Sequence, residues 1–406
     1  MERIMKRVTD MEPRISRRRL LGGVATLAVA GGMGWYAAGR GVFDDRRGAP
    51  FAPWTAFRGE RGGGLIELVR AAVLAASPHN TQPWLFELHE DRIDVFSDPS
   101  RSLGDMDPFG REMHIGLGCA VENLALAAGS MGWTTRVELG AGRLPLFDTR
   151  AAPPTRVATV RLEPGGAESP LARAIAERHT NRGPYGAQRV PAAALRELSN
   201  LNEDRASIEI VWLERPEQRE IFAAHTLRAT EIIARDASMI EDSDAWFRLT
   251  PEAVRTHRDG LTFDVMGLGP LLTTAVKLMP RPSPERMHDD WLRVTRDVHL
   301  AGDPITGVIA ARDRYDLGAT LRAGRLWQRM QLWATARGIA MQPLSQVPEV
   351  IDRERQLGRA PAMERSFAGA LRLGDGQPTM AFRLGHAVRA GVPGLRRAAE
   401  DVIRAR

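Results

Sequence analysis

Residues 77–84 read SPHNTQPW, a polar octapeptide between a helical and an extended stretch. An alanine-rich run over residues 71–76 leads into it, which predicts a helix that stops at the first proline. Alternating apolar residues follow it, which predicts a strand. A histidine, an asparagine and a glutamine therefore gather where a helix stops and a strand begins. Any function proposed for the chain has to explain them.

The surrounding sequence predicts a mixed succession of helices and strands. Residues 84–88 and 92–96 alternate well enough to form a hairpin that turns at residues 89–91. A long helix is expected from Asp107 to about Met131, because Asp caps helices and the following proline suits a first turn. Further helices are predicted over 65–76, 171–178 and 216–236, and further strands over 208–213 and 307–311.

The long helix has a counterpart 206 positions later in the chain. The offset aligns identical residues at four positions: Gly118 with Gly324, Leu126 with Leu332, Ala128 with Ala334 and Gly132 with Gly338. We interpret this match as an internal duplication in which the two helices pack on each other. The segment 249–284 has no counterpart, and its apolar run 265–279 is either an extra core helix or a flap over a pocket.

A second polar motif, Arg178-x-Thr180-x-Arg182, follows the helix predicted over 171–178. Two guanidinium groups with a hydroxyl between them suit a phosphate and a polarised carbonyl, because arginine offers planar multidentate donors and threonine a short one. A plain surface helix can carry the same pattern, so the motif alone leaves both interpretations open.

Composition bounds the class of protein. The 406 residues are 43% hydrophobic, which allows two globular domains or one large fused domain. Residues 1–40 carry five of the six net positive charges, and no basic stripe is interleaved with aromatics, so nucleic-acid binding is not expected. Cys119 is the only cysteine, which excludes intrachain disulfides and predicts a buried, inert thiol. No metal-ligand spacing or G-x-S-x-G motif is present, so we expect no metal.

The N-terminal segment has the features of a targeting sequence. Ser16-Arg-Arg-Arg-Leu-Leu21 precedes a 19-residue uncharged stretch, 20–38, that ends before Arg40. This pattern resembles a twin-arginine export signal, although 19 residues nearly reach the ~20 needed for a membrane anchor. Export across the cytoplasmic membrane is therefore expected, with or without a tether. The expected boundaries are 1–40 for the leader, 41–61 for a linker, 62–165 for a first half and 166–406 for a second half.

Several motifs together resemble the FMN-dependent nitroreductase superfamily. They are SPHNTQPW, the long small-residue helix, and RHTNRGPY at residues 178–185. The segments LRAG (321–324), GIAMQPLSQ (338–346) and FRLG (382–385) resemble its fused double-copy branch. The resemblance covers roughly residues 62–400. It implies an α+β, nitroreductase-like fold in which two tandem copies form an intrachain pseudo-dimer.

In that superfamily FMN lies at a subunit interface, between an R-x-[S/T]-x-R arm and a P-S-x-x-N-type loop. The first copy here has SPHNTQ, but residues 58–61 lack the spacing of the arm. The second copy has RHTNR, but residues 201–206 (LNEDRA) offer no such loop. Two copies of this kind would build one complete site and one ruined site, so we expect a single FMN per chain.

The resemblance assigns roles to the polar residues of both motifs. Arg178 and Thr180 would face the flavin phosphate and ribityl chain. Arg182 would lie near N1/O2 of the ring, where a cation stabilises the reduced flavin. Asn80 and Gln82 would supply amides to the ribityl chain or to polar atoms of the ring.

Other residues would complete the flavin site. Ser77 and Pro78 would shape the loop against the ring face, and His79 is either a contact or a packed structural residue. Leu344-Ser345 would bring backbone groups near flavin N5. Arg396-Arg397 resembles the closing basic pair of the family and would complete the phosphate site, unless it lies on a solvated helix face.

The resemblance implies an exported or membrane-tethered flavoprotein oxidoreductase, monomeric as a pseudo-dimer. It would reduce an electron-poor acceptor such as a nitroaromatic or a quinone. The donor would be NAD(P)H or, outside the cytoplasm, a quinol. Two alternatives remain open. One is a non-catalytic FMN-storage protein whose flavin is covered by residues 249–284, and the other is an envelope structural protein on a decayed fold.

Overall fold

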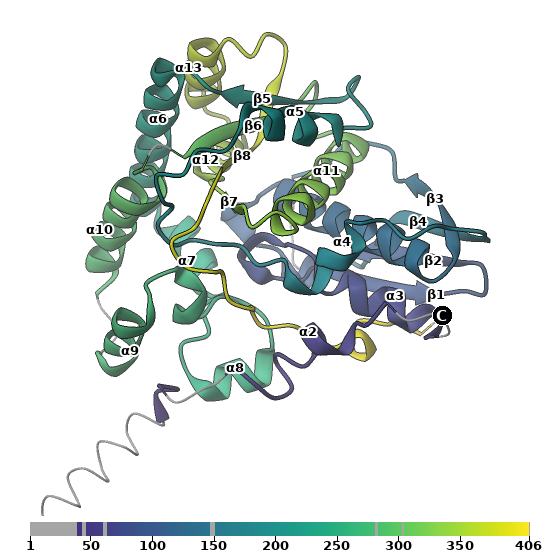
Figure 1. Cartoon of the computed structure of the whole chain (residues 1–406). Helices are drawn as coiled ribbons and strands as arrows, with labels where there is room; N and C mark the ends of the chain where they lie inside the picture. The colour runs from purple at the N-terminus through teal and green to yellow at the C-terminus, as the bar shows by residue number, and fades with distance from the viewer. Residues whose placement is uncertain are drawn as a thin grey trace, which may run out of the picture.

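The computed structural model describes residues 39–42, 46–59, 63–146, 151–280, 283–302 and 304–405. All but the last two residues of the expected leader therefore lie outside the described residues. The fold is α+β, with two four-stranded antiparallel sheets that lie on either side of two long helices (Figure 1). The predicted class, with two tandem halves, is confirmed. No helix of the described part has both the length and the apolar character needed to cross a membrane.

The first sheet contains the predicted hairpin. Its spatial order is β1-β2-β4-β3, with strands β1 (Trp84–Leu88), β2 (Arg92–Ser97), β3 (Trp133–Leu139) and β4 (Thr155–Pro164). The residues of β3 alternate between partly buried and exposed positions, so this sheet keeps one face toward solvent at its edge. The helix α3 (Gly64–Ala72) packs against the long helix on the inner side.

The second sheet has the same order, β5-β6-β8-β7. Its strands are β5 (Ile208–Leu213), β6 (Ile305–Ala311), β7 (Ala340–Pro343) and β8 (Gln377–Gly385). Nearly every residue of β8 is buried, because helices cover both faces of this sheet. Phe382 belongs to the central core between the sheets, and Ala381 belongs to a second core formed with α6 (Pro216–Arg235), α12 (Gln346–Gln356) and α13 (Ala362–Leu371).

The two halves share more than strand order. In each, one long helix connects the second and third strands: α4 (Arg111–Ser130) in the first and α11 (Leu317–Thr335) in the second. These helices pack on each other between the sheets (Figure 1). A Cβ on Gly118 would lie 2.1 Å from the carbonyl oxygen of Leu321, and one on Gly324 would lie 2.0 Å from that of Ile115. Equivalent glycines thus meet at the crossing, as the offset of 206 predicted.

Cys119 lies at the same crossing and is fully buried, as predicted. Its thiol donates to the carbonyl oxygen of Gly324 at 3.2 Å. Burial raises the pKa of this thiol far above its usual range, which removes the reactive thiolate.

Several sequence predictions of helices need correction. The long helix begins at Arg111 rather than Asp107, because Gly110, with φ of +63°, interrupts the backbone there. Asp107 still caps the helix from outside, since its carboxylate accepts from the backbone N–H groups of Glu112 and Met113. The helix predicted over 171–178 is a 3₁₀ segment, η5 (Ala172–Glu177). The expected linker 41–61 contains a short helix, α2 (Pro53–Ala56), whose Trp54 is buried.

The remaining helices lie on the second half and on the segment that precedes β6. They are α5 (Ala192–Asn200), α7 (Ala237–Asp244), α8 (Pro251–His257), α9 (Pro270–Leu278) and α10 (Pro284–Val294). The C-terminal segment returns from the second sheet to the first, where Phe86 and Ile403 form a parallel bridge. The end of the second half therefore packs on the first half, which brings residues 390–398 beside the octapeptide.

Candidate functional site

The octapeptide forms a strained loop after the turn that ends α3. A short 3₁₀ turn, η2 (Pro78–Asn80), is followed after three residues by β1. Three residues that are not glycine have positive φ: His79 at +44°, Asn80 at +55° and Gln82 at +51°. Each costs on the order of 1 kcal/mol or more, and such strain is held only where the surroundings enforce it, often at functional sites. The loop packs on α4, where a Cβ on Gly116 would lie 3.2 Å from atoms of Ser77 and Pro78.

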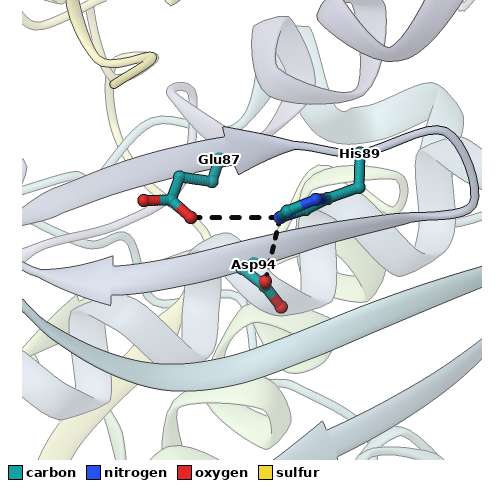
Figure 2. Close-up of side chains that lie close together, drawn as sticks. All are labelled: Glu87, His89 and Asp94. Carbon is teal, nitrogen blue, oxygen red and sulfur yellow. Dashed lines mark ion pairs between the residues drawn. The ribbon is translucent and has the colours of Figure 1, made fainter. Parts of the chain in front are cut away.

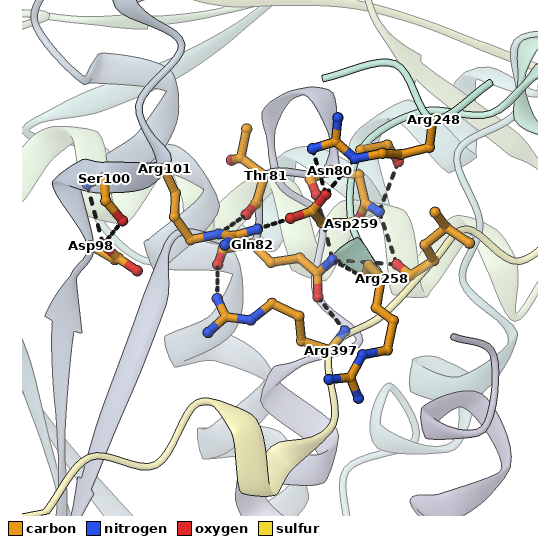
Figure 3. Close-up of polar contacts among 12 residues, drawn as sticks. Asn80, Thr81, Gln82, Asp98, Ser100, Arg101, Arg248, Arg258, Asp259 and Arg397 are labelled. Carbon is orange, nitrogen blue, oxygen red and sulfur yellow. Dashed lines mark hydrogen bonds and ion pairs between the residues drawn. The ribbon is translucent and has the colours of Figure 1, made fainter. Parts of the chain in front are cut away.

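The amides of this loop bind protein backbone. Asn80 Nδ2 donates to the carbonyl oxygens of Leu395 (2.8 Å) and Gly260 (3.1 Å). Gln82 Nε2 donates to the carbonyl oxygen of Arg258 (3.0 Å), and its Oε1 accepts from the backbone N–H of Arg397 (2.8 Å). Figure 3 shows these contacts converging from three segments that are far apart in the sequence. Both amides therefore fasten the C-terminal segment and the 258–260 loop, a role that sequence reasoning missed.

Arg178 of the predicted arm is buried beside the end of α3. Its Nη1 donates to Oε1 of Gln331 (2.9 Å) and its Nη2 to the carbonyl oxygen of Leu74 (3.2 Å), while its buried Nε has no partner. Burial lowers the pKa of Arg178 to about 10, with a smaller contribution from the charge of Arg182. Thr180 is half-buried between these two arginines in sequence.

Arg182 donates from Nη1 to the carbonyl oxygen of Val265 at 3.2 Å. Burial lowers its pKa to about 10. Burial and, to a smaller extent, the nearby charge of Arg182 lower the pKa of His79 to about 4. The imidazole of His79 is therefore neutral at pH 7. Nε2 of His79 is 2.9 Å from Oγ of Ser243. The half-sites of the two copies are therefore brought together, with His79 of one beside Arg182 of the other.

Arg396 completes a cluster of cations at this place, in which Arg178 and Arg396 are buried and Arg182 is half-buried. It is 4% exposed, donates to Oδ1 of Asn80 and to the carbonyl oxygen of Ala75 (3.2 Å), and lies 4.7 Å above the Trp54 ring. Burial and then the Arg178 charge lower its pKa well below the usual value. The alternative of a solvated helix face is wrong for Arg396, because residues 390–398 are not helical and this side chain points inward.

Among the described residues, no carboxylate pairs with Arg178, Arg182 or Arg396, which we call the unpaired cluster. The buried Nε atoms of Arg178 and Arg396 and Nδ1 of His179 also have no hydrogen-bond partner. Taking a cation out of water is expensive unless an opposite charge compensates it. The donor set of the unpaired cluster is therefore suited to an anion.

On the opposite side of the helix crossing, three arginines do pair with carboxylates. Arg322, Arg325 and Arg329 of α11 occupy the positions that Gly116, Cys119 and Asn123 hold on α4, by the offset of 206. Their carboxylate partners are Asp204 at 2.9 Å from Arg322, Glu122 at 2.7 Å from Arg325, and Glu203 for Arg329. Glu203 and Asp204 belong to the loop before β5, the counterpart of the octapeptide. We call this set the paired cluster.

The segment 249–284 lies on both half-sites. The carbonyl groups of Arg258, Gly260 and Val265 accept from Gln82, Asn80 and Arg182, as described above. A Cβ on Gly267 would lie 2.5 Å from the carbonyl carbon of Arg182, so the two backbones are in contact. The interpretation as a core helix is wrong, because the leucines of α9 are exposed. The interpretation as a flap over a pocket stays a prediction, and we call the segment 249–284 the flap.

Asp259 fixes this segment to the first half. It is 4% exposed and forms ion pairs with Arg101 of the first half and with Arg248 at 2.7 Å (Figure 3). Both guanidinium groups also lie over the Trp246 ring, at 5.4 and 5.5 Å from its centroid. No sequence pattern predicted this contact, since its members come from separate elements.

Two further predicted site residues lie beside a different polar group. Leu344 is buried and donates from its backbone N–H to the carbonyl oxygen of Ala381 at 2.8 Å. Ser345 is the N-cap residue of α12 and lies near Glu112, whose carboxylate is 3.2 Å from buried Arg111. Their assignment near flavin N5 stays a prediction. Arg397, by contrast, holds the loop, because its Nη1 donates to the carbonyl oxygen of Gln82 at 3.3 Å.

The β1–β2 hairpin brings together three side chains able to ligate a metal (Figure 2). Nε2 of His89 lies 3.1 Å from Asp94 and 3.9 Å from Glu87. Sequence spacing did not reveal this group, because Glu87 and Asp94 meet only through the strand register. Its three potential ligands are one imidazole and two carboxylates, a set that Zn²⁺ and other transition metals accept.

Arginines already balance the two carboxylates of this hairpin. Arg92 and Arg156 lie 3.5 and 3.7 Å from the aspartate, and Arg404 lies 3.1 Å from the glutamate. Three guanidinium groups would repel a divalent cation, so the arrangement is explained as a network of ion pairs.

No family model matches this chain. Two Mycobacterium tuberculosis proteins, from strains CDC 1551 and H37Rv, are each 29% identical to it over 317 residues, which is 78% of this chain and 83% of theirs. Both carry the description "Putative NAD(P)H nitroreductase". Solved structures that match include the FMN-dependent nitroreductase NfnB from Mycobacterium smegmatis in complex with NADPH (TM-score 0.39) and a nitroreductase with bound FMN from Desulfitobacterium hafniense (TM-score 0.37). Each is 14% identical, and each alignment covers 58% of this chain and 98% of the other.

Proposed function

We propose that this chain is an FMN-dependent oxidoreductase of nitroreductase type, with one flavin bound between its two halves. The observation that carries the proposal is the unpaired cluster, Arg178, Arg182 and Arg396, beside the strained octapeptide. A buried cation without a counter-charge favours a bound anion, and FMN brings a phosphate and, when reduced, a negatively charged ring. The Mycobacterium tuberculosis relatives, described as NAD(P)H nitroreductases, point to the same class of reaction.

The residues fit the phosphate end of FMN. The Nε atoms of Arg178 and Arg396 and Nδ1 of His179 are buried donors or acceptors without a partner, so a phosphate would satisfy groups that the protein leaves open. The ring end requires an exchange of contacts, because the Val265 carbonyl now takes a hydrogen bond from Arg182. We therefore propose that the backbone around Val265 shifts when flavin binds, while the 258–260 loop stays in place.

The bound flavin supplies two-electron chemistry that no side chain of this chain can perform. With FMN bound, Arg182 would stabilise the negative charge that the ring gains on reduction. Neutral His79 adds no second positive charge beside Arg182 and orients the loop through Ser243. Asp259, held by two arginines, keeps the 258–260 loop in place over the octapeptide.

The acceptor is proposed to be an electron-poor organic molecule such as a nitroaromatic or a quinone. The donor is proposed to be NAD(P)H, with a quinol as the alternative if the leader places the protein outside the cytoplasm. We also propose that residues 1–40 direct export and that residues 20–38 can tether the chain to the membrane. The chain is proposed to work as a single pseudo-dimer that arose by duplication.

A second candidate function is storage of FMN without catalysis. The specific observation in its favour is that segment 249–284 binds both half-sites at once through Asn80, Gln82 and Arg182. A cover that stays closed over the flavin would exclude substrates.

The first test is the visible spectrum of the purified protein. Wild type is expected to retain a flavin absorption band, and Arg178→Ala is expected to lose it, because the phosphate loses a buried guanidinium. Arg322→Ala, from the paired cluster, is the matched control and should retain flavin. If flavin is retained by Arg178→Ala as well as by Asn80→Ala, the assigned site is wrong.

Stopped-flow reduction then separates the two candidate functions. Protein with bound flavin is mixed with NADH, NADPH or a soluble quinol, and then with a nitroaromatic or a quinone. Bleaching followed by reoxidation supports the oxidoreductase. A flavin that stays bound and inert with every pair supports storage.

A further inference from the structure

The helix α9 presents its apolar side to solvent. Leu271 is 89% exposed, Leu272 52%, Met279 55% and Leu278 37%. Helical spacing places the three leucines on one side of α9, and Met279 follows directly as the C-cap residue. A surface helix of a globular protein normally does the reverse and turns its apolar stripe toward the core. Here the buried residue of the helix is a threonine, Thr273. We call the four exposed residues the α9 face.

These residues form a patch rather than scattered exposure. The other large hydrophobic side chains exposed in the described part of the chain are Leu146, Leu357 and Val388, which lie far from one another in the sequence. Single exposed residues of that kind are ordinary, whereas a contiguous apolar patch marks a site of contact with another phase or molecule.

The position of α9 is fixed by polar contacts on its other side. Lys277, on that side, forms an ion pair with Asp264 at 2.8 Å. Its Nζ also donates to the carbonyl oxygen of Gly41 at 3.0 Å. Arg40 donates to the carbonyl oxygens of Lys277 (2.6 Å) and Met279 (2.7 Å). The start of the described chain is therefore tied to the C-terminal end of α9.

The sequence before this attachment is the uncharged stretch 20–38. Only Gly39 separates it from Arg40, and two residues span at most about 7 Å. A membrane that held residues 20–38 would therefore begin close to the C-terminal end of the α9 face. The apolar sequence 20–38 thus continues into the segment that is attached to α9, which indicates what covers the α9 face.

We propose that the α9 face docks onto the surface of a lipid bilayer, the same bilayer that holds residues 20–38. Four adjacent apolar side chains suit the interfacial region, where an amphipathic helix lies with its apolar face about 5–10 Å deep in the headgroup and acyl boundary. The inference rests on the membrane tether of the proposed function and is independent of flavin binding.

Docking would also set the position of the flap. The ends of η6 (Phe263–Met266) and α9 are joined through Gly267 and Gly269, and η6 carries the Val265 carbonyl that binds Arg182. One end of this short segment thus contacts the candidate site while the other faces lipid. Lipid-soluble quinones and quinols would meet the protein on this side.

A fluorescence experiment on the full chain tests the proposal. The environment-sensitive dye NBD is attached to Leu271→Cys, and the chain is reconstituted in vesicles of phosphatidylethanolamine and phosphatidylglycerol. The native Cys119 is buried and should not react, which labelling of wild type verifies. Spin-labelled lipids with the nitroxide near the headgroup are expected to quench the Leu271→Cys dye by about twofold or more. Leu357→Cys, exposed on another surface, should be quenched by aqueous iodide instead.

Three outcomes would overturn the proposal. The first is a Leu271→Cys dye that stays accessible to iodide in vesicles. The second is shielding without lipid that rises with protein concentration, which would indicate a second copy of the chain. The third is shielding without lipid at every concentration, which would indicate residues 20–38 themselves. Met279→Cys repeats the measurement in case the dye at residue 271 disturbs the helix.

A further label separates this proposal from the one on which it rests. Dye on Ala30→Cys reports whether the leader enters the bilayer, and the flavin spectrum reports the site. Lipid quenching at residue 30 without quenching at residue 271 would refute docking while leaving the tether and the flavin site intact.

Discussion

The two arginine clusters on either side of the α4–α11 crossing have opposite charge balance. In the paired cluster, Arg322, Arg325 and Arg329 each meet a carboxylate. In the unpaired cluster, Arg178 and Arg396 are more deeply buried and meet only neutral groups within the described chain. The same architecture therefore holds one interface in which each arginine has a carboxylate partner and one in which, among the described residues, the arginines have none.

This difference indicates that the paired cluster stabilises the fold, whereas the unpaired cluster is suited to binding a ligand. A cation that pairs with a carboxylate of the protein stabilises the fold and is less able to bind an anionic ligand. A buried cation without a partner destabilises the fold until an anion binds, because no attractive interaction offsets the free-energy cost of its desolvation. One side of the crossing is thus suited to holding the halves together, and the other to holding a ligand between them.

The largest effect should follow from disrupting the α4–α11 crossing, on which both clusters depend. Gly324→Ala places a methyl group 2.0 Å from the carbonyl oxygen of Ile115, so α4 and α11 must separate. We expect a loss of about 3 kcal/mol or more in the free energy of unfolding. Gly369→Ala in α13, where no atom lies within 4 Å of the added carbon, is the control and should be neutral or slightly stabilising. Urea denaturation measures both, and equal stability of the two variants would contradict the close crossing.

The second prediction compares the clusters directly. Arg325→Met leaves the buried Glu122 short of one partner, and we expect it to lower the free energy of unfolding by about 2 kcal/mol. Arg178→Met removes an uncompensated charge together with two hydrogen bonds, so flavin-free protein should stay within about 1 kcal/mol of wild type. Denaturation of the flavin-free variants measures both. A cost for Arg178→Met equal to that of Arg325→Met would mean that both clusters are structural.

A third prediction uses ligands in place of mutations. FMN at ten times its dissociation constant should stabilise flavin-free protein by about 1.4 kcal/mol through mass action. Riboflavin, which lacks the phosphate, should stabilise it less at the same concentration. Arg178→Met should abolish the difference between the two ligands and Arg325→Met should preserve it, as followed by thermal unfolding. Equal stabilisation by riboflavin and FMN in wild type would show that the phosphate does not reach the unpaired cluster.

The smallest expected effect is a pH dependence on the unpaired side. The pKa of His79 is lowered from its ordinary value of 6.5 to about 4, because burial and the Arg182 charge disfavour the imidazolium. The unfolded chain therefore binds a proton first as the pH falls. The contribution of His79 to stability is complete above pH 6.5 and is lost between pH 6.5 and 4, with about 1 kcal/mol lost by pH 5.5.

The variant His79→Gln should reduce this slope. Its stability at pH 5.5 relative to pH 7.5 should fall less than that of wild type, measured by urea denaturation at both values. An unchanged slope would place the proton uptake on the other buried histidines, such as His179, whose pKa is lowered to about 3 by burial and nearby arginines.

Much of the local structure could be read from the chain. The hairpin over 84–97 follows from alternation, and β5 and α6 were predicted to within a residue. The start of α4 was missed because a capping aspartate followed by proline looks like a helix start, whereas the backbone turns once more at Gly110. The glycine pair at the crossing was predictable, because an exact offset between two small-residue helices implies equivalent positions in space.

Tertiary contacts decided what those motifs do. The sequence identified Asn80, Gln82 and Arg178–Arg182 as polar residues that needed a partner, since polar side chains at element boundaries are local features of the chain. It did not reveal that backbone carbonyls of the flap accept hydrogen bonds from the two side-chain amides. Nor did it reveal that Asp259 fixes the flap through ion pairs with two arginines. Such pairings depend on which residues meet across more than a hundred positions. Charge balance in particular is a property of a folded neighbourhood, so the paired and unpaired clusters could be told apart only once the two halves were packed together.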